Sequence, residues 1–340
     1  MVAGINDINV SRWLDDNIDG LSSPYSFTLI AGGRSNLTYK VTDAHGRHVV
    51  LRRPPLGHVL ATAHDMSREH RIISAIGSSP VPVPRTLGLC TDVSVNDAPF
   101  YVMSYVEGTV LDSPSKGEQL PVHLRQAASH HLIDVLADLH SLDVDDIGLG
   151  DLAKRSGYIE RQVKRWSTQW ENSKTRDLSA IDEVADILAK NIPTQQGVVV
   201  AHGDFRFGNC LADIATGRVV AVLDWELCTL GDPLADLGYI GVYWTDHGHP
   251  LLREVDPSGI EGFPNYADLV QRYADRTGRD VSNVGYYRAF SSWRLAIISE
   301  GGFARFTKGA MGDTGEDTAL MKASTEVLAE SALQAVRELS

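Results

Sequence analysis

The hydrophobic pattern of this chain changes its period near residue 110, and that change constrains the fold more than any other feature. Before it, short apolar runs alternate with turn-forming residues. The stretch 26–53 reads SFTLIAGGRSNLTYKVTDAHGRHVVLRR, which predicts three strands with turns at 31–35 and 43–47. Apolar runs within 80–90 and 99–108 predict two more strands, and helical spacing across 61–77 predicts one helix that Gly77 ends.

After residue 110 the apolar residues recur mainly at helical spacing. This spacing predicts helices within 122–143, 179–193, 232–244 and 318–339, with only two short strands between them. The turn-rich segment VEGTVLDSPSKGEQLP, at 106–121, separates the two patterns. A length of 340 residues suits one large domain or two coupled ones. We therefore predict an α+β protein with a small β-rich domain over 1–106, containing one helix, and a larger helical domain over 107–340.

Composition excludes several classes of protein. The formal net charge is −13, from 31 Lys and Arg against 44 Asp and Glu, which argues against nucleic acid as a general partner. It leaves room for one anionic ligand in a local basic pocket. No run approaches the roughly 18 apolar residues that span a membrane. Three separated cysteines and the lack of a signal-peptide pattern lead us to expect a reducing, cytoplasmic location.

Two apolar runs in the middle of the chain lead into carboxylates. The first reads GVVVAHGDFRFGN and the second RVVAVLD, so that Asp204, Asn209 and Asp224 follow strand-like stretches. Gly203 and Gly208 interrupt regular structure, which predicts that Asp204 and Asn209 share a loop. A carboxylate there can accept the proton of a hydroxyl, while an amide oxygen can bind a hard cation such as Mg²⁺.

Asp224 and Arg206 complete this predicted catalytic set. Asp224 would be a second metal ligand beside Asn209, because Mg²⁺ usually takes one or two carboxylates together with phosphate oxygens. Arg206 could offset charge on a transferring phosphoryl group. The order of a loop Asp, an Asn five positions later and a further Asp is the pattern of protein kinases.

The arrangement resembles the aminoglycoside phosphotransferase and choline kinase family, whose members are relatives of protein kinases. In that family the catalytic loop commonly starts His-Gly-Asp, as at His202, and the second acid lies in a stretch similar to VLDWE, at 222–226. The segment GDPLADLG, at 231–238, looks like the one that supports the site in the family. The resemblance covers nearly the whole chain. It implies a two-lobed protein-kinase-like fold and an enzyme that uses ATP and Mg²⁺.

The turn AGGRSN, between the first two predicted strands, lies where a kinase needs a flexible turn over the nucleotide phosphates. Gly32 and Gly33 would let backbone N–H groups approach the phosphates, and Ser35 and Asn36 would add side-chain donors. A Gly-Gly hairpin that binds no ligand would have the same sequence, so this signal depends on the other parts of the site.

The next part that the resemblance implies is a cation on the third strand, paired with a helix carboxylate. Alternation with Val50 makes Arg52 the inward candidate in HVVLRR, with Arg53 as its rival, and Glu69 is the expected partner. The family usually has Lys at this position. A guanidinium can contact phosphates through two nitrogens, but it is bulkier than an ammonium, so the replacement is not conservative.

The stretch FYVMSYVEG resembles the linker that lines the adenine pocket in the family. Met103 would form the back wall of that pocket, although Met is equally common as core filling. The backbone from Ser104 to Val106 would bind the base, and Tyr105 is counted among the nucleotide contacts.

Two further stretches bear on the alcohol that accepts the phosphate. GLGDLAKRSGYIERQVKRWSTQW and LAIISEGGFARFTKGAMGD are similar to the kinase domains fused to some acyl-CoA dehydrogenases and to their free-standing bacterial relatives. That branch implies a hydroxyacyl-CoA acceptor. The first stretch carries basic residues that suit a CoA phosphate, although a solvated amphipathic helix has the same composition: Lys154, Arg155, Arg161, Lys164 and Arg165.

Other functions fit parts of the same pattern. An aminoglycoside phosphotransferase would use the same catalytic residues on a cationic acceptor. A nucleotide-binding pseudokinase would explain an Arg in place of Lys. A protein kinase fits less well, because the chain has no Asp-Phe-Gly or Ala-Pro-Glu segment. A metal-dependent hydrolase using His202, Asp204 and Asp224 leaves the N-terminal part unexplained.

Overall fold

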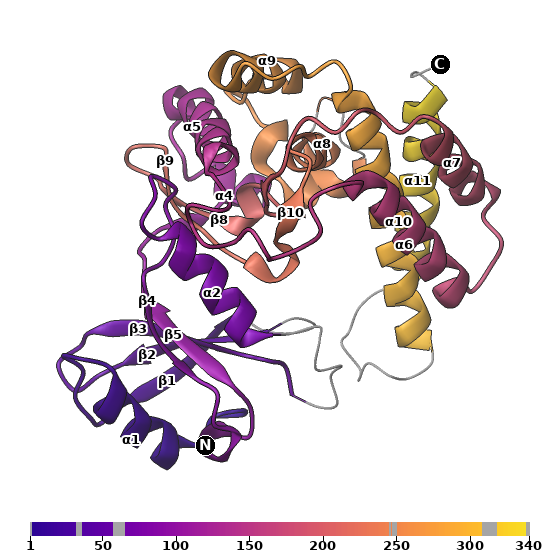
Figure 1. Ribbon diagram of the computed structural model, residues 1–340. Coiled ribbons are helices and arrows are strands. Elements are labelled where there is room, and N and C mark those ends of the chain that lie inside the picture. The colour runs from indigo at the N-terminus through magenta and orange to yellow at the C-terminus, as the bar shows by residue number, and fades with distance from the viewer. Residues whose placement is uncertain are drawn as a thin grey trace. The chain divides into compact units, whose positions relative to one another are not determined.

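The structure is a computed structural model that describes residues 2–31, 36–56, 65–244, 246, 250–307 and 318–337. Most of its helices and strands are labelled in Figure 1. The chain divides into two compact units. The smaller unit is Met1–Gly108 with Val220–Leu227, and the larger is Thr109–Val219 with Cys228–Ser340.

The smaller unit contains an antiparallel five-stranded sheet of order β1-β2-β3-β5-β4. All five strands predicted from the sequence are confirmed. Their bounds are β1 Ser26–Ala31, β2 Leu37–Thr42, β3 His48–Arg53, β4 Thr86–Cys90 and β5 Phe100–Ser104. The predicted helix is α2 (Met66–Ile76), which Gly77 caps. The structure adds two helices to it, α1 (Asp7–Asn17) and the short α3 (Val93–Asn96).

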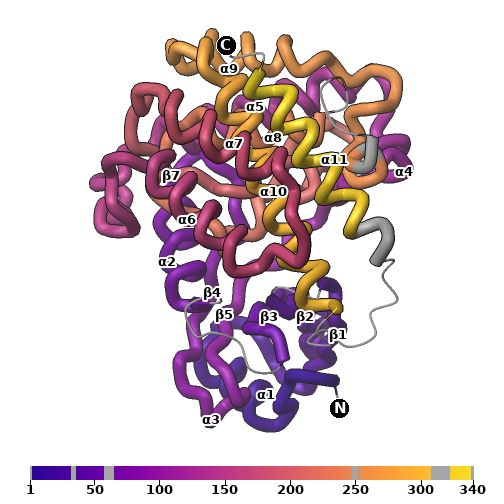
Figure 2. The backbone as a smooth tube through the Cα atoms, turned by 90° about the vertical axis from the view of Figure 1, so that its right-hand side faces the viewer, coloured from indigo at the N-terminus to yellow at the C-terminus, as the bar shows by residue number. Residues whose placement is uncertain are grey.

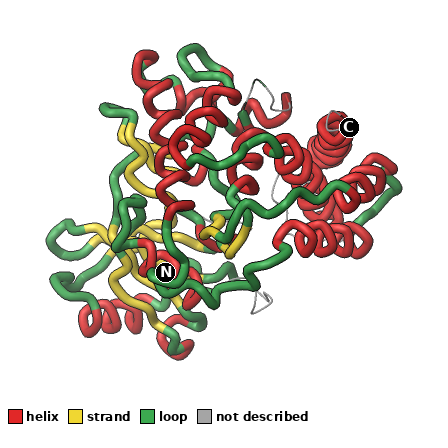
Figure 3. The backbone as a smooth tube through the Cα atoms, turned by 45° about the horizontal axis from the view of Figure 1, so that its top comes forward, coloured by secondary structure: helices red, strands yellow, loops and turns green. Residues whose placement is uncertain are grey.

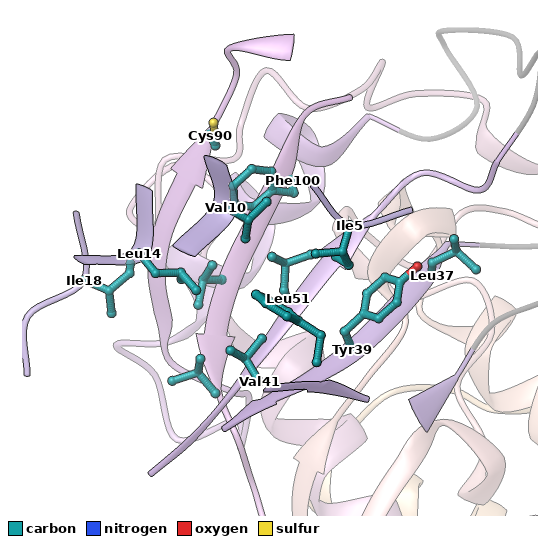
Figure 4. Packing of buried hydrophobic residues seen from close by; sticks show 13 residues of the cluster. Ile5, Val10, Leu14, Ile18, Leu37, Tyr39, Val41, Leu51, Cys90 and Phe100 are labelled. Atoms are coloured by element: carbon teal, nitrogen blue, oxygen red, sulfur yellow. The ribbon is translucent and has the colours of Figure 1, made fainter. Parts of the chain in front are cut away.

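Helix α1 covers one face of this sheet. Asn6 begins it by accepting a hydrogen bond from the backbone N–H of Asn9 at 3.3 Å. Figure 4 shows Val10 and Leu14 directed toward the strand residues of a single apolar cluster. The cluster consists of Ile5, Val10, Leu14, Ile18, Phe27, Leu37, Tyr39, Val41, Val49, Leu51, Cys90, Phe100 and Val102.

The opposite face of the sheet carries the alternate strand residues. Arg52 lies opposite Tyr101 in the register of β3 and β5, and Val50 lies opposite Met103. Helix α2 contacts β4 and β5. Because successive side chains in a strand point to opposite faces, Arg53 is directed away from α2, and its guanidinium donates to the carbonyl of Asn96 at 3.2 Å.

The segment Val220–Leu227 belongs to the smaller unit although it is distant in sequence. It comprises the end of β9 (Arg218–Val222) and the 3₁₀ turn η2 (Trp225–Leu227). The backbone N–H of Val222 donates to Pro82 at 2.8 Å, and η2 contacts α2. Asp224 therefore belongs to the smaller unit, a placement that the sequence does not predict.

The larger unit is mainly helical, as the red segments of Figure 3 show. The predicted helices are confirmed as α5 (Val122–Ser141), α7 (Ser179–Lys190), α8 (Leu234–Tyr243) and α11 (Thr318–Arg337). Further helices are α4 (Pro114–Gly117), α6 (Tyr158–Ser173), α9 (Tyr266–Thr277) and α10 (Val284–Thr307), with short 3₁₀ turns at Pro250–Val255 and Pro257–Gly259. Figure 2 shows α10 beside α11. No described helix is both long and apolar enough to cross a lipid bilayer.

Short strands in the larger unit flank the loop that contains Asp204 and Asn209. β7 (Val199–Ala201) pairs with β10 (Thr229–Gly231), and β6 (Thr109–Val110) pairs with β8 (Cys210–Asp213). The loop between β7 and β8 contains the 3₁₀ turn η1 (Phe207–Asn209). The carboxylate and the amide predicted to share a loop therefore both lie between β7 and β8.

Candidate active site

The catalytic-loop candidates Asp204 and Asn209 contact each other directly. The Nδ2 group of Asn209 donates to the backbone carbonyl of Asp204 and to its Oδ2, both at 2.8 Å. The pairing joins the buried Asn209, 9% exposed, to the side chain of Asp204, which is 23% exposed. It fixes the carboxylate and leaves the amide oxygen of Asn209 as an acceptor for another partner.

Asp236 of α8 holds the start of this loop. Its two carboxylate oxygens accept hydrogen bonds from the backbone N–H groups of His202 and Gly203, each at 2.7 Å. Asp236 is only 1% exposed, and although burial alone raises its pKa, the hydrogen bonds and His140 lower it below the usual value. The segment GDPLADLG therefore binds the N–H groups of the two residues that precede Asp204, which agrees with the supporting role that the resemblance implies.

Two further residues connect Asp236 to other helices. The Nε2 atom of His140, in α5, lies 3.2 Å from Asp236, and its Nδ1 lies 2.8 Å from the hydroxyl of Tyr273 in α9. His140 is 2% exposed and Tyr273 is fully buried. No local sequence pattern identifies this chain of contacts, because its members come from three helices.

Arg206 lies beside the carboxylate of Asp204, the predicted base. Its Nε is 3.6 Å from Asp204 Oδ1, and its guanidinium carbon is 4.7 Å from the centre of the Tyr243 ring. Burial alone lowers the pKa of Arg206, but Tyr243 and Asp204 outweigh that effect and raise it above its usual value. Arg206 is therefore charged near the predicted base, as a group that stabilises phosphoryl charge must be.

A second arginine, Arg294 of α10, contacts the residue before Asp204 and was not identified from the sequence. Its Nη2 donates to the carbonyl of Gly203 at 2.8 Å, and its guanidinium carbon is 4.7 Å from the Tyr239 ring centre. Burial raises the pKa of Tyr239 well above its ordinary value, and the Asp204 carboxylate raises it further. In the larger unit, Arg206 thus lies beside Asp204 itself, and Arg294 binds the carbonyl of the residue before it.

The smaller unit brings together Arg52, Glu69 and Asp224. Arg52 Nε lies 3.0 Å from Glu69 Oε1, and Arg52 Nη2 lies 2.6 Å from Asp224 Oδ1. Burial alone lowers the pKa of Arg52, but the neighbouring carboxylates, Glu69 foremost, raise it above its usual value. The expected pairing of Arg52 with Glu69 is therefore present. Arg53, the rival candidate for this position, is directed to the other face of the sheet and does not pair with Glu69.

Asn36, which follows the Gly-rich turn, contacts the same group of acids. Its Nδ2 lies 3.3 Å from Glu69 Oε2 and 3.4 Å from Glu226 Oε2. Asn36 is 3% exposed. Glu226 was not predicted as a site residue. The other predicted phosphate-contacting residues of the turn, Gly32, Gly33 and Ser35, lie outside the described residues.

The predicted adenine-contacting residues lie at the end of β5. Met103 is 6% exposed on the same face of the sheet as Arg52. Tyr105 is half-buried, with its ring 5.6 Å from that of His48 and beneath the ammonium of Lys40. The N–H of Ser104 already donates to Arg85 at 2.8 Å, so this amide, predicted to bind the base, is engaged within the protein.

The basic stretch at 154–165 is partly engaged in structural contacts. Arg155 donates to Asp145 at 2.8 Å, and Arg161 donates to backbone carbonyls, including that of Lys154 at 2.6 Å. Arg165, which is exposed on α6, lies over the ring of Trp166. These contacts leave Lys154, Lys164 and Arg165 as the more accessible cations of the stretch.

The donor chemistry of the two proposed metal ligands fits Mg²⁺. Asn209 uses its nitrogen toward Asp204, which leaves an amide oxygen. Asp224 uses Oδ1 toward Arg52, which leaves Oδ2, and the side chain is 28% exposed. Hard oxygen ligands of this kind are the ones that Mg²⁺ prefers. The two residues belong to different units, and their convergence on one ion stays a prediction.

Comparison with known proteins agrees with the fold. A model of the phosphotransferase enzyme family matches residues 26–268. Acyl-CoA dehydrogenase family member 10 of Mus musculus is 36% identical over 281 residues, 82% of this chain and 26% of that protein. Acyl-CoA dehydrogenase family member 11 of Gallus gallus is 34% identical over 318 residues, 91% of this chain and 40% of that protein. The chain thus spans less than half the length of these relatives.

Solved structures show the same architecture. A candidate aminoglycoside phosphotransferase from Ralstonia eutropha superposes with a TM-score of 0.82 and 32% identity, covering 97% of this chain and 98% of that one. The aminoglycoside phosphotransferase APH(4)-Ia, in a complex with AMP-PNP and hygromycin B, gives a TM-score of 0.61 and 16% identity, covering 95% and 98%. The predicted kinase-like α+β fold is confirmed.

Proposed function

The chain belongs to the phosphotransferase enzyme family, and we propose that it transfers the γ-phosphate of Mg²⁺-bound ATP to the hydroxyl of a small molecule. The observation that carries this proposal is the pairing of Asp204 with Asn209 on a loop whose backbone is bound by buried Asp236. A general base and a metal-binding amide on one rigid loop are what phosphoryl transfer to an alcohol requires.

Each catalytic residue has a definite part in the proposed reaction. The Asp204 carboxylate orients the acceptor hydroxyl and takes its proton as the oxygen attacks the γ-phosphorus, whose bond to the β–γ bridging oxygen breaks so that ADP leaves. Arg206, which is charged and close to Asp204, stabilises negative charge on the phosphoryl oxygens. When bound by Asn209 and Asp224, Mg²⁺ would neutralise charge on the triphosphate. Most of the rate enhancement would come from positioning and electrostatics.

The smaller unit supplies the proposed nucleotide contacts. Arg52 presents a charged guanidinium beside Asp224. Asn36, Met103 and Tyr105 occupy the sequence positions that the family resemblance implies for nucleotide contacts. A fold relative has been solved with AMP-PNP, and aminoglycoside 2'-phosphotransferase-IIIa, another fold relative, has been solved with GDP. These complexes support a nucleoside triphosphate as the donor here, with ATP as the proposed one. The proposal requires Asp204, Asn209 and Asp224 to converge on one nucleotide.

The acceptor that we propose is a hydroxyacyl-CoA. Relatives at 30–36% identity carry the name acyl-CoA dehydrogenase family member, which supports an acyl-CoA partner for this part of their chains. The charged groups around Asp204 also favour an acyl-CoA over an aminoglycoside as the acceptor. Arg206 Nε lies 3.6 Å from Asp204 Oδ1, Arg294 binds the carbonyl of the preceding residue, and these positive charges disfavour an acceptor that carries several ammonium groups. This is the opposite of what a polycationic aminoglycoside would favour.

A panel of alcohols distinguishes these acceptors. ADP release from Mg²⁺-ATP would be measured with 3- and 4-hydroxyacyl-CoAs, with the corresponding free hydroxy acids and with kanamycin, and the products identified by mass. We expect a phosphorylated hydroxyacyl-CoA and no turnover of kanamycin. Phosphorylated kanamycin as the main product would replace our proposal by the aminoglycoside alternative. Equal rates for wild type and Asp204→Ala on every alcohol would indicate a nucleotide-binding pseudokinase.

A further inference from the structure

The guanidinium of Arg52 contacts three separate elements of the smaller unit through three different nitrogen atoms. Nε lies 3.0 Å from Glu69 of α2, and Nη1 donates to the hydroxyl of Thr38 in β2 at 3.3 Å. Nη2 donates to Asp224, in the segment Val220–Leu227, at 2.6 Å. The Arg52 side chain is 11% exposed, so the contacts are made largely out of solvent.

The planar shape of the guanidinium is what makes this arrangement possible. Its donors point in fixed, diverging directions, so that one side chain can bind groups on different sides at once. A lysine ammonium places all of its donors on a single nitrogen. It could retain one of the two carboxylates, but it could not hold Glu69 and Asp224 in the same directed geometry while also reaching Thr38. The arginine is therefore suited to joining elements, beyond carrying a positive charge.

We infer that Arg52 is a positioning residue for Asp224, which it fixes to the smaller unit in the orientation needed to bind the metal ion. This inference rests on the proposed function, because it takes Asp224 as a ligand of that ion. Oδ1 of Asp224 accepts the hydrogen bond from Arg52, so Oδ2 is the oxygen presented to the metal. The role is distinct from the phosphate contact that the family pattern implies for this position.

The backbone at Asp224 shows why such a contact is needed. Asp224 has φ +64°, in the left-handed region, which a residue other than glycine adopts at some cost in strain, although Asp tolerates it better than most residues. The segment around it is fixed at one end by the bond from Val222 N–H to Pro82. Arg52 fixes the carboxylate itself, and it does so from the strand that forms the middle of the sheet.

A second contact joins the same segment to the smaller unit. The Nδ2 group of Asn36 lies within 3.4 Å of both Glu69 and Glu226, and Glu226 is two residues after Asp224. The acids Glu69, Asp224 and Glu226 therefore gather around one guanidinium and one amide. With Arg52 shortened to a lysine, Asn36 would still tether the segment, but the direction of the Asp224 carboxylate would no longer be fixed.

Metal affinity is the quantity that separates positioning of Asp224 from a phosphate contact. Mn²⁺ would be titrated into wild type and Arg52→Lys saturated with AMP-PNP, with binding followed by water-proton relaxation. Binding of AMP-PNP alone would be measured in EDTA. Arg53→Lys is the matched control, because it shortens an arginine on the same strand that is directed to the other face of the sheet.

We expect Arg52→Lys to weaken Mn²⁺ binding about 10- to 100-fold, as is typical when a residue that orients a metal ligand is changed. AMP-PNP binding in EDTA should change less than about threefold, since the variant keeps the charge, and Arg53→Lys should resemble wild type in both measurements. If Arg52→Lys instead lost AMP-PNP affinity in EDTA and kept the Mn²⁺ affinity of wild type, Arg52 would be a phosphate contact only, and the inference would be wrong.

A second measurement keeps this inference separable from the proposed function. Amide hydrogen exchange in 220–227, with no nucleotide or metal added, should be at least about tenfold faster in Arg52→Lys than in wild type. Unchanged exchange would overturn the anchoring by Arg52 even if the enzyme phosphorylates an alcohol. Faster exchange in a protein that binds neither AMP-PNP nor Mn²⁺ would support the anchoring and remove the proposed function.

Discussion

Replacement of Asp236 by asparagine tests how the catalytic loop is held. The carboxylate accepts three hydrogen bonds from buried donors: the N–H groups of His202 and Gly203 at 2.7 Å and Nε2 of His140 at 3.2 Å. An asparagine has one acceptor oxygen, and its NH₂ group would face one of the donors. At least one backbone N–H therefore loses its partner, and the negative charge is lost from all three contacts.

The size of the effect follows from these contacts. A hydrogen bond to a charged group contributes about 1.5–3 kcal/mol, and a buried donor without a partner costs about 1–3 kcal/mol. One lost bond and one unsatisfied donor together predict that Asp236→Asn lowers the free energy of unfolding by about 2.5–6 kcal/mol. Because Asp204 follows directly after the two amides, phosphoryl transfer should fall at least about 100-fold even in the folded variant.

Urea unfolding followed by tryptophan fluorescence would measure the stability change at pH 7.5, and again as the pH is lowered. The pKa of Asp236 is below its ordinary value of 3.8 in the folded chain, so its stabilisation is present above that value and is lost as pH falls through the folded pKa. The difference from wild type should therefore shrink below about pH 4. Asp138→Asn, at an exposed ion pair with Arg276, is the control. A change for Asp236→Asn within about 0.5 kcal/mol of that control would refute the reasoning.

Two further predictions concern stability in the larger unit. Burial raises the pKa of Asp256 from 3.8 to about 6, so the stability linked to its neutral form is complete below pH 3.8 and is lost as the pH rises through 6. Urea unfolding should therefore show Asp256→Asn to be more stable than wild type by about 3 kcal/mol at pH 8 and no different at pH 4. Gly238→Ala would place a Cβ atom 2.6 Å from the carbonyl carbon of Tyr287, in the contact between α8 and α10. This substitution should destabilise the protein by about 2–3 kcal/mol in the same assay, and unchanged stability would mean that the two helices pack less closely than these distances indicate.

The elements that the sequence predicts are those with a clear local period. The strands of the smaller unit alternate between two faces, and α5 and α7 carry a single apolar stripe, so each could be placed from its own residues. Helix α10 could not, because residues around its whole circumference are buried, Tyr287, Trp293 and Ile297 among them, and no polar face marks it. Helix α1 was missed although Asn6, Val10 and Leu14 gave a usable signal.

The site residues likewise fall into those that a local sequence pattern predicts and those that it does not. The order and spacing of Asp204, Asn209 and Asp224 can be recognised as a kinase motif from the sequence alone. The strand and the helix that carry Arg52 and Glu69 are also predicted correctly, so this pair could be expected. His140, Tyr273 and Arg294 come from helices distant in sequence, and no local pattern connects them to the loop. The sequence also gave no sign that the segment with Asp224 belongs to the smaller unit, since that depends on contacts with Pro82 and α2.

Transfer of labelled phosphate from γ-³²P-ATP to a 4-hydroxyacyl-CoA, compared between wild type and Asp204→Ala, tests the central claim most directly. The account predicts that wild type labels the acyl-CoA in the presence of Mg²⁺ and that the loss of the base lowers the rate about 10²- to 10⁴-fold at unchanged ATP affinity. Labelling at the same rate by both proteins would contradict it, because the hydroxyl would then be activated by some group other than the carboxylate that this loop holds in place.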